Sequence, residues 1–546
     1  MRRNKKLAAA AMAVLTASAI LTGCGNDAAT NATAGNSAAS ENTDNAGNTG
    51  TEGEGEQTAS GERPTITFML QDFTGNALNN ENSDKVVEKM EEYTNTHVDF
   101  RWEASDTYQE KFGVTLLDKD NIPMILTSPN GVDSNVLSAA KRDAFWDLTE
   151  YLKDEEAYPN LSQADPETLK AMTVDGKIIG IYRTRNLGRY GMSYRTDWAE
   201  KVGVTEAPST VDELYDMMDK FAHNDPDGNG EDDTYGMELC KYTGPLDIMQ
   251  TWFGVGNDWV EQDGKLVPVH QTPEYMEALN WMKSLVDNGL VRKDWAAVDT
   301  TTWADGIKKG EAGVFVDTMD GAKGAWQYYI QQDVKSVVNS EETASITYVG
   351  PLAKDENSDP KTLAHTGYGG CFLITKEGAK TEEDLKNCLH YLDKMCDDEM
   401  LVLADYGLEG ITWEYANEEK TELVKTDAAL DGTQIPNAGL NQTLCYIPHE
   451  ASVNPALQLD EPTKLMQEAQ ELNKTVAVRN PATEYLLNSE ENAQNGLTLE
   501  QILDDARTQY VCGAIDEAGL QQAWQEWEER GGAKLIEEVN AQYQAK

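Results

Sequence analysis

Oxygen-bearing side chains recur at alternate positions in an acidic, glycine-rich stretch, residues 225–236. Gly228 and Gly230 stand where a tight loop needs positive φ angles. A hard cation such as Ca²⁺ binds several oxygens that a short loop wraps around it. We therefore expect a calcium site, and the alternative is an acidic surface turn without metal. The expected ligands are the side chains of Asp225, Asp227, Asn229 and Asp233 and the backbone carbonyl of Glu231.

The elements on either side of this loop would hold it in place. Ser209–Phe221 has the apolar spacing of a helix, and Thr210 and Glu213 form a capping box at its start. The loop ends at Gly236, where a calcium-sensor loop has a bidentate Glu, and the alternating residues 237–239 indicate a strand. This order of helix, loop and strand favours a static clip over a helix–loop–helix sensor.

The length and charge of the chain limit its class. Its 546 residues exceed what one core supports, so we expect two or more lobes. The formal net charge of −50 disfavours nucleic acid and anionic lipid as partners. Six cysteines follow Cys24 without a CxxC pair, and we expect most of them to be small buried side chains and not zinc ligands.

Common enzyme signatures are absent from the sequence. It has no HExxH, GxSxG, phosphate-binding loop or dinucleotide fingerprint. Its 95 carboxylate residues guarantee that some pair fits glycoside hydrolysis, so such a pair carries no information. We therefore expect a binding protein and not an enzyme.

The first 24 residues have the layout of an export signal. A basic start precedes the apolar run Leu7–Ile20, which is short for a membrane-spanning helix. The run ends in Leu21-Thr22-Gly23-Cys24, which resembles the bacterial lipobox, whose Cys is lipidated. Residues 25–63, mostly Gly, Asn, Ala, Thr, Ser and Glu, are expected to be a flexible tether. Cys24 would anchor the protein to the outer face of the cell membrane, and an uncleaved anchor helix is the alternative.

The body of the chain has the pattern of an α/β fold. Strand Thr65–Leu70, helix Lys85–Tyr93 and strand Val98–Trp102 form an expected βαβ unit, which predicts a parallel sheet. Further strands are expected at Ile122–Thr127, Gly313–Asp317, Ile346–Val349 and Cys371–Thr375. Further helices are expected at Pro273–Asn288 and Thr381–Met395, with a helical region at Leu520–Gln542.

Several motifs occur in an order that resembles one family. They are the lipobox, Tyr108–Phe112, Ile122–Leu126, Asp175–Tyr182, Tyr194–Trp198, Pro208–Leu214, Asp233–Gly236 and Tyr406–Gly410. Together they resemble the extracellular solute-binding proteins of bacterial ABC importers, and especially the lipoprotein-type alginate-oligosaccharide-binding proteins. The resemblance covers the chain from about residue 64 to residue 546.

The resemblance implies a two-lobed clamp of the type II periplasmic-binding-protein class, with crossover segments as hinges. It also implies an oligosaccharide ligand and an ABC permease as partners, and we expect a monomer. In the alginate binders a loop like residues 225–234 holds a structural calcium, but their acidic ligand after Asp233 is replaced here by Thr234. The implied first lobe comprises residues 64–183 and 366–405, and the implied second lobe residues 187–350 and 412–546.

Ligand contacts are expected at strand ends and lobe crossings, because ligands bind outside the carboxyl ends of strands. Trp and Tyr offer a sugar ring a flat apolar face with a polar edge, while planar polar groups bind its hydroxyls. The candidate contacts are Gln71, Asp72, Tyr182, Arg185, Tyr190, Trp252, Trp303, Asp317, Tyr368 and Trp413.

Four arginines cluster within a short stretch of this acidic chain, at Arg183, Arg185, Arg189 and Arg195. They could grip a carboxylated sugar through bidentate hydrogen bonds. Pairing with local Asp and Glu is the alternative, which a chain so rich in acids favours. A uronate and a neutral oligosaccharide both stay open as ligands.

These features predict a lipid-anchored receptor of an importer. It would capture an oligosaccharide, close on it and deliver it to a membrane permease. Two alternatives stay open: the same clamp binding a peptide or another small solute, and a surface carbohydrate-active enzyme.

Overall fold

The computed structural model describes residues 63–73, 77–105, 107–118, 120–299, 304–430, 439–447 and 456–545. All of them belong to one compact unit, residues 62–546. The expected signal segment with Cys24, the tether up to residue 62, and Trp303 lie outside the described residues. Within the described ranges, no helix is both long enough and apolar enough to cross a membrane.

The first sheet has five strands in the order β2-β1-β3-β14-β6. Strand β1 runs parallel to β2 and β3, whereas β14 runs antiparallel to β3 and β6. Helix α1 (Ser83–Thr94) connects β1 to β2, which confirms the expected βαβ unit. The strands are β1 (Thr65–Asp72), β2 (His97–Ala104), β3 (Ile125–Ser128), β6 (Ile181–Thr184) and β14 (Tyr368–Ile374).

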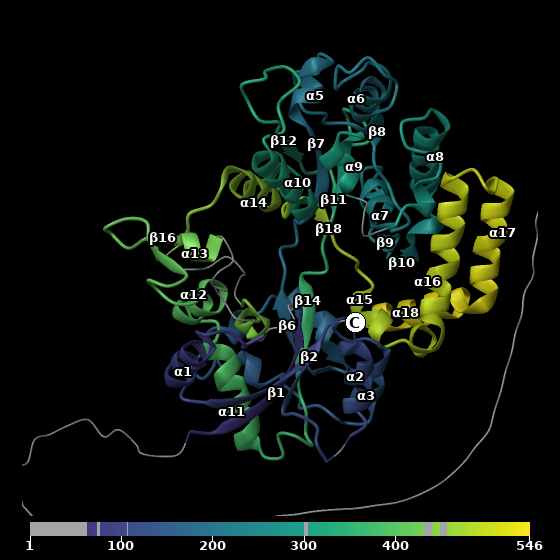
Figure 1. Cartoon of the computed structure of the whole chain (residues 1–546). Helices are drawn as coiled ribbons and strands as arrows, with labels where there is room; N and C mark the ends of the chain where they lie inside the picture. Colours follow the sequence, from purple (N-terminus) through teal and green to yellow (C-terminus); the bar gives the residue numbers. More distant parts are fainter. Residues whose placement is uncertain are drawn as a thin grey trace, which may run out of the picture. The chain divides into compact units, whose positions relative to one another are not determined.

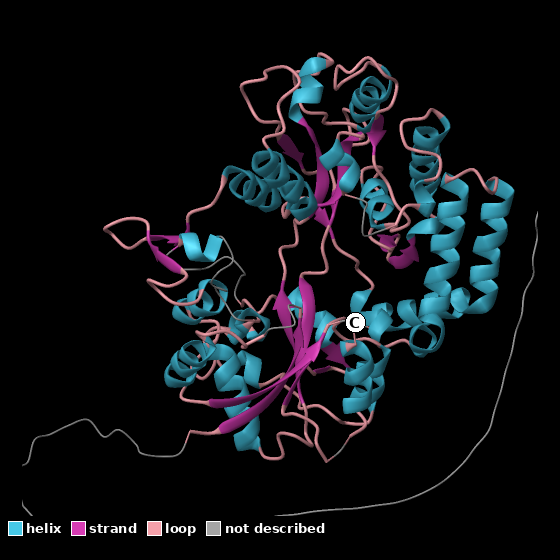
Figure 2. Cartoon of the chain, viewed as in Figure 1, coloured by secondary structure: helices cyan, strands magenta, loops and turns pink. Residues whose placement is uncertain are grey.

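Helices cover both faces of the first sheet and bury its apolar side chains (Figures 1 and 2). Phe68 of β1 is fully buried and meets Phe372 of β14 edge-on, with ring centroids 5.1 Å apart. The same ring meets Tyr391 at 6.4 Å, so strand and helix share one core. The main covering helices besides α1 are α2 (Tyr108–Thr115), α3 (Ser134–Lys141), α11 (Glu382–Lys394) and α12 (Asp398–Tyr406).

The second sheet has four strands in the order β12-β7-β11-β8. Strand β11 runs parallel to β8 and antiparallel to β7, which in turn pairs antiparallel with β12. The expected strands at Gly313–Asp317 and Ile346–Val349 are confirmed as β11 and β12. The strands are β7 (Tyr190–Arg195), β8 (Tyr235–Met237), β11 (Ala312–Thr318) and β12 (Ile346–Val349).

Helix α6 (Val211–His223) packs on β8 and β11 and begins at the predicted capping box. The Thr210 hydroxyl accepts a hydrogen bond from the Glu213 backbone N–H, and the Glu213 carboxylate accepts from the Thr210 backbone N–H. A capping box of Thr381 and Asp384 likewise starts α11, where a helix was expected. The other long helices of this half are α7 (Gly244–Thr251), α8 (Pro273–Asp287), α10 (Met319–Gln332) and α14 (Glu461–Asn473).

The C-terminal residues form three helices beside α8 (Figure 1). They are α16 (Glu490–Val511), α17 (Glu517–Trp527) and α18 (Ala533–Gln544). The expected helical region Leu520–Gln542 is therefore split, because Gly531 takes a φ of 138° that no helix contains. Helix α16 was not expected from the sequence.

The remaining elements are short and connect the larger ones. They are α4 (Pro166–Leu169), α5 (Thr196–Lys201), α9 (Asp305–Lys309), α13 (Asp427–Leu430), α15 (Thr483–Leu487), β4 (Thr173–Val174), β5 (Lys177–Ile178), β9 (Trp259–Gln262), β10 (Lys265–Pro268), β13 (Thr362–Leu363), β15 (Trp413–Tyr415), β16 (Glu422–Lys425), β17 (Ala456–Leu457) and β18 (Ala477–Val478).

The two sheets have separate hydrophobic cores. The first core takes its residues from 66–182 and 371–447, and the second from 192–363 and 506–520. Each sheet with its core is one lobe, and segments 185–189 and 364–367 cross between them. The implied division differs at one place: Leu440, Leu444 and Ile447 are buried in the first core, although residues 412–546 were expected in the second lobe.

A buried ion pair stabilises the second lobe where β7 meets α5. Arg195 donates from Nε and Nη2 to the two carboxylate oxygens of Asp197, at 2.8 and 2.7 Å, and both side chains are 4% exposed. The guanidinium also stacks over the rings of Trp198 and Tyr329. Asp197 accepts a further bond from the Val337 backbone N–H at 3.0 Å. Because both side chains are buried, water cannot take the place of either partner.

We predict that Asp197→Ala destabilises the protein by about 3–5 kcal/mol, because it leaves a buried guanidinium without a counter-charge. Urea unfolding followed by circular dichroism measures the loss. Asp294→Ala is the matched control, since Arg292 and Asp294 have the same sequence spacing and the same paired geometry but are exposed. Equal losses in the two variants would contradict the prediction.

Candidate functional site

Two of the expected ligand residues meet where the second sheet faces the crossing segments. Tyr190 begins β7, and Asp317 lies beside it near the end of β11, opposite Gly191. The Tyr190 ring packs against His365 of the second crossing segment, with ring centroids 5.4 Å apart. The Asp317 Oδ1 atom is buried and has no hydrogen-bond partner. An aromatic ring and a carboxylate with one unpartnered oxygen thus lie on neighbouring strands at a lobe crossing.

Burial shapes the electrostatics of this group. It raises the pKa of Asp317 to about 6, although a hydrogen bond from the Thr318 backbone opposes the shift. Burial, and after it the Asp317 carboxylate, also raise the pKa of Tyr242. Asp247 adds to the pKa shifts of both Tyr190 and Tyr242, so the four groups lie within electrostatic range of one another. Sequence reasoning missed Tyr242 and Asp247, since neither lies directly at a strand end.

The first lobe contributes Arg185 and Tyr368 from neighbouring chain segments. Tyr368 of β14 lies opposite Thr184 of β6, and Arg185 follows directly. Arg185 donates from Nη1 to the Thr184 carbonyl at 2.8 Å. A Cβ at Gly369 would lie 3.0 Å from the Arg185 Nε atom, so the guanidinium lies against the β14 backbone. The structure therefore brings these two expected residues together.

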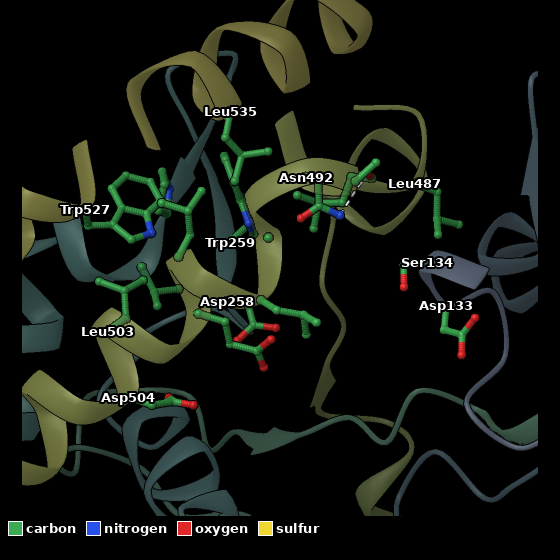
Figure 3. A pocket seen from close by; sticks show the side chains of 18 of the residues that line it. Asp133, Ser134, Asp258, Trp259, Leu487, Asn492, Leu503, Asp504, Trp527 and Leu535 are labelled. Carbon is green, nitrogen blue, oxygen red and sulfur yellow. Dashed lines mark hydrogen bonds between the residues drawn. The ribbon is translucent and has the colours of Figure 1, made fainter. Parts of the chain in front are cut away.

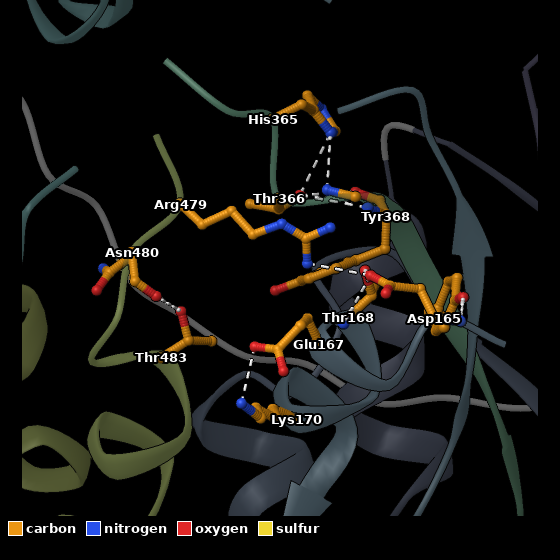
Figure 4. Close-up of polar contacts among 12 residues, drawn as sticks. Asp165, Glu167, Thr168, Lys170, His365, Thr366, Tyr368, Arg479, Asn480 and Thr483 are labelled. Atoms are coloured by element: carbon orange, nitrogen blue, oxygen red, sulfur yellow. Dashed lines mark hydrogen bonds and ion pairs between the residues drawn. The ribbon is translucent and has the colours of Figure 1, made fainter. Parts of the chain in front are cut away.

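A third connecting segment, residues 479–482, links the second lobe to the first through Arg479. Its Nη1 donates to the Asp165 Oδ2 atom at 3.0 Å, close to Tyr368 (Figure 4). Burial raises the pKa of Asp165, but hydrogen bonds from Thr168 and Arg479 outweigh it and lower the pKa overall. The charged pair joins the connecting segment 479–482 to Asp165, the N-cap residue of α4, and neither member was among the expected site residues.

A cavity of ≈ 750 Å³ lies between the first lobe and the C-terminal helices. Residues 130–137 of the first lobe form one wall, while second-lobe residues and helices α16–α18 form the others (Figure 3). The volume is that of a typical small-molecule site. Its polar lining includes Gln109, Asn130, Asp133, Ser134, Asn135, Asp247, Gln250, Asp258, His270, Asn492, Glu500, Asp504 and Arg507.

The Arg507 guanidinium belongs to this wall and is buried, and its Nε atom has no partner. It binds the Asp247 carboxylate and, at 3.0 Å, the Asp504 carboxylate. Nearby, Gln250 is 1% exposed and its Oε1 atom has no partner, and His270 is 3% exposed with both ring nitrogens unpartnered. Burial lowers the pKa of His270 to about 4, so the ring is neutral at pH 7.

The structure removes three expected residues from the candidate contacts, because their side chains are buried. Trp252 is 1% exposed and packs edge-on against Trp281, and Trp413 is 6% exposed and donates from Nε1 to the Gly407 carbonyl. Tyr182 is 2% exposed, and its hydroxyl accepts from the Asp165 backbone N–H at 2.6 Å. These three rings therefore contribute to packing inside the protein and not to a ligand site.

Gln71 and Asp72 lie at the end of β1, as expected, and are half-buried. Asp72 accepts a hydrogen bond from the Ala77 backbone N–H at 3.3 Å. Strands β1 and β3 run parallel, so the two residues share an edge of the sheet with Ser128 and the loop that lines the cavity. They remain candidates on position alone.

The clustered arginines bind groups of the protein itself. Arg189 pairs with Asp320 at 2.9 Å, and the Arg195 pair is described above, so local pairing is confirmed for both. Arg183 is buried and donates to the Leu444 carbonyl at 3.2 Å. The four side chains do not form one anion-binding group.

The acidic loop brings its expected side chains toward one another. The Asn229 Nδ2 atom donates to Asp227 at 2.8 Å and to both oxygens of Asp233 at 3.3 Å. The Asp225 Oδ1 atom is buried without a partner. Burial, together with the Asp225 and Asp233 carboxylates, raises the pKa of Asp227. Across the described ranges, no set of three or more His, Cys, Asp and Glu side chains has the spacing of a formed metal site.

Packing explains both departures of this loop, at Gly236 from a sensor loop and at Thr234 from the loop of the alginate binders. A Cβ at Gly236 would lie 2.7 Å from the Met218 Cβ and 2.8 Å from its carbonyl oxygen, so no side chain fits at position 12. The Thr234 hydroxyl donates to the Phe221 carbonyl at 2.8 Å and so closes the end of α6. The loop ties helix α6 to strand β8.

Comparison with known proteins places this geometry in context. A sequence profile for bacterial extracellular solute-binding protein matches residues 85–401. Lipoprotein LipO of Bacillus subtilis (strain 168) is 36% identical over 495 residues, which cover 89% of this chain and 94% of LipO. The polygalacturonan/rhamnogalacturonan-binding protein YtcQ of the same organism is 30% identical over 461 residues, covering 83% of this chain and 87% of YtcQ.

Solved structures show the same fold. An extracellular solute-binding protein from Bifidobacterium longum subsp. infantis superposes with a TM-score of 0.65, over 90% of this chain and 99% of that one. Its sequence identity is 17%, so this likeness concerns the fold alone. The expected two-lobed α/β clamp is confirmed.

The raised pKa of Asp317 predicts a pH-dependent gain in stability for Asp317→Asn. A carboxyl group with a higher pKa in the folded state binds protons more tightly there, so it lowers stability as the pH rises through about 4 to 6. The variant should melt at a higher temperature than the wild type near pH 8, with the difference shrinking toward pH 4. Thermal unfolding across this range measures it. Asp359→Asn, at an exposed position, is the control, and a pH-independent difference for Asp317→Asn would contradict the assignment.

Proposed function

Because this chain belongs to the bacterial extracellular solute-binding proteins, we propose that it captures an oligosaccharide between its lobes as the substrate-binding component of an ABC importer. One observation carries the proposal: the ≈ 750 Å³ cavity takes walls from both lobes, and Asp247 of its lining lies within electrostatic range of Tyr190 and Tyr242. A ligand held there contacts both lobes at once. Its binding free energy therefore favours the closed arrangement.

The groups at the site suit a sugar. The Tyr190 ring, which is only partly buried, offers a flat apolar face to a pyranose ring. Asp317 Oδ1 and Gln250 Oε1 are buried acceptors without partners, and sugar hydroxyls would satisfy them. A hydrogen-bonding ligand gains most at such sites, because buried acceptors are costly while they stay unpaired.

The proposal includes a lipid anchor and a permease. Lipidated Cys24 would attach the protein to the outer face of the cell membrane, and the tether would allow a reach on the order of 30–40 Å. The lipobox-like sequence supports this, as does the name of the similar lipoprotein LipO. The protein would release its ligand unchanged to the transmembrane subunits, so its role is binding and not catalysis.

A panel of oligosaccharides tests the proposed function. A bound sugar should raise the melting temperature by roughly 5 °C at saturation, because it stabilises only the folded state. Tyr190→Ala should reduce that shift. Tyr328→Ala, which removes a partly exposed Tyr outside the site, should leave it unchanged. The absence of a shift with every oligosaccharide, combined with a shift from a peptide, would replace the sugar by a peptide ligand.

We further propose that the acidic loop holds a structural Ca²⁺. The ligands would be the side chains of Asp225, Asp227, Asn229 and Asp233 and the carbonyl of Glu231. The donor set fits a hard cation: the Asn229 amide nitrogen already lies between two carboxylates, and Asp225 Oδ1 lacks a partner. The ion would neutralise these carboxylates and so stabilise the second lobe.

Calcium removal tests this part of the proposal. EDTA should lower the melting temperature, and added Ca²⁺ should restore it. Asp227→Ala should abolish the response. Asp232→Ala is the matched control, because Asp232 is an exposed acid of the same loop outside the expected ligand set. A wild-type protein indifferent to both reagents would exclude the calcium site.

A further inference from the structure

The charge of the cavity lining is uneven. Five carboxylate side chains line it, and among the described lining residues Arg507 is the one Lys or Arg. The carboxylates come from both lobes and from α16. They belong to Asp133, Asp247, Asp258, Glu500 and Asp504.

The single guanidinium is not available to a ligand. Arg507 is 4% exposed, its Nη1 and Nη2 atoms bind Asp247 and Asp504, and its Nε atom is buried without a partner. A ligand carboxylate could form two parallel hydrogen bonds with this guanidinium only by displacing one of those two carboxylates. Asp133 is also engaged, since it caps α3 through the Asn135 and Val136 backbone N–H groups. Asp258 and Glu500 have no cationic partner among the described contacts, and both keep contact with solvent in the cavity.

The carboxylates repel one another at this wall. Desolvation comes first and the neighbouring Asp247 carboxylate second among the causes that raise the pKa of Asp258, and the Arg507 guanidinium opposes part of the shift. Desolvation and the charges of Asp504 and Asp247 raise that of Glu500 in the same way. A further negative charge in the cavity would add to this repulsion.

Other groups at the wall are neutral and suited to uncharged partners. Gln250 Oε1 and the two nitrogens of His270 are buried without partners. Trp259, Leu503 and Trp527 supply apolar surface beside Asp258 (Figure 3). Hydroxyl or amine groups on a ring with apolar faces would satisfy both kinds of surface.

We infer that the cavity selects oligosaccharides without carboxylate groups, neutral or amine-bearing, and that Asp258 and Glu500 exclude uronates. This inference rests on the proposed function and concerns the same site. It separates this chain from the relative YtcQ, whose name gives polygalacturonan and rhamnogalacturonan as its ligands. Sequence identity of 30% leaves room for such a change in the lining.

Isothermal titration calorimetry with matched trisaccharides tests it. The probes are galacturonic acid trimer, glucosamine trimer, N-acetylglucosamine trimer, maltotriose and cellotriose. At least one carboxylate-free probe should bind at least about tenfold more tightly than the galacturonic acid trimer. In the double variant Asp258→Asn, Glu500→Gln the galacturonate affinity should rise about tenfold, while maltotriose or cellotriose affinity stays within about twofold.

The double variant should fold, because Asn tolerates the positive φ of 57° at residue 258 and keeps an acceptor for the Asn480 amide. Its melting temperature checks this. Glu537→Gln on α18, an exposed residue outside the cavity lining, is the control for the charge change and should alter no affinity.

The possible results distinguish a failure of the carboxylate-exclusion inference from a failure of the proposed function. Tighter binding of galacturonic acid trimer than of every other probe would overturn this inference and leave the proposed function standing. An unchanged galacturonate affinity in the double variant would remove Asp258 and Glu500 as the selecting residues. Failure of all sugars, including the wider panel above, would overturn the proposed function and the inference with it.

Discussion

The division of buried apolar side chains between two cores is the constraint on which the rest of the structure depends. Each sheet closes on its own helices, so the described links between the first lobe and the C-terminal segment are polar, as in Arg479–Asp165 and the bond from the Asp175 backbone to Asn488. Polar contacts at an exposed boundary exchange readily with water and contribute little net stability. The lobes can therefore part and close without disturbing either core. Ligand capture by closure follows from this separation.

Burial also determines which groups the arginine side chains bind. A guanidinium that folding removes from water needs acceptors beside it: Arg195 and Arg507 have carboxylates, and Arg183 has the Leu444 carbonyl. Because Arg195 and Arg507 are bound to other carboxylates, they do not form ion pairs with Asp258 and Glu500, which line the cavity. In a chain with a net charge of −50, an acidic site is the default, and an anion-binding site would need arginines exempt from internal pairing. In the structure Arg189, Arg195 and Arg507 pair with carboxylates, while Arg183 and Arg185 donate to backbone carbonyls.

Features with a local cause could be predicted from the sequence, whereas features set by tertiary packing could not. The capping box at Thr210, the helix capped by Thr381 and the alternating strands needed only their own residues, and they form as expected. Tyr190 and Trp252 have similar side-chain chemistry, yet one faces a crossing segment and the other is buried in a core. The cavity joins Asp247 to Arg507 across 260 residues, and no local pattern links them.

The acidic loop shows how packing can override a chemical motif. Strand β8 approaches α6 so closely that Gly236 admits no side chain, and the Thr234 hydroxyl closes the helix end at Phe221. The two positions where related loops place a further acidic ligand are thus used to join helix and strand. Strand β8 pairs with β11, which carries Asp317 three residues beyond that pairing. A loop bound this tightly to the sheet cannot swing open as a sensor does, so a cation there would stabilise the lobe that presents Asp317 and leave the arrangement of the site unchanged.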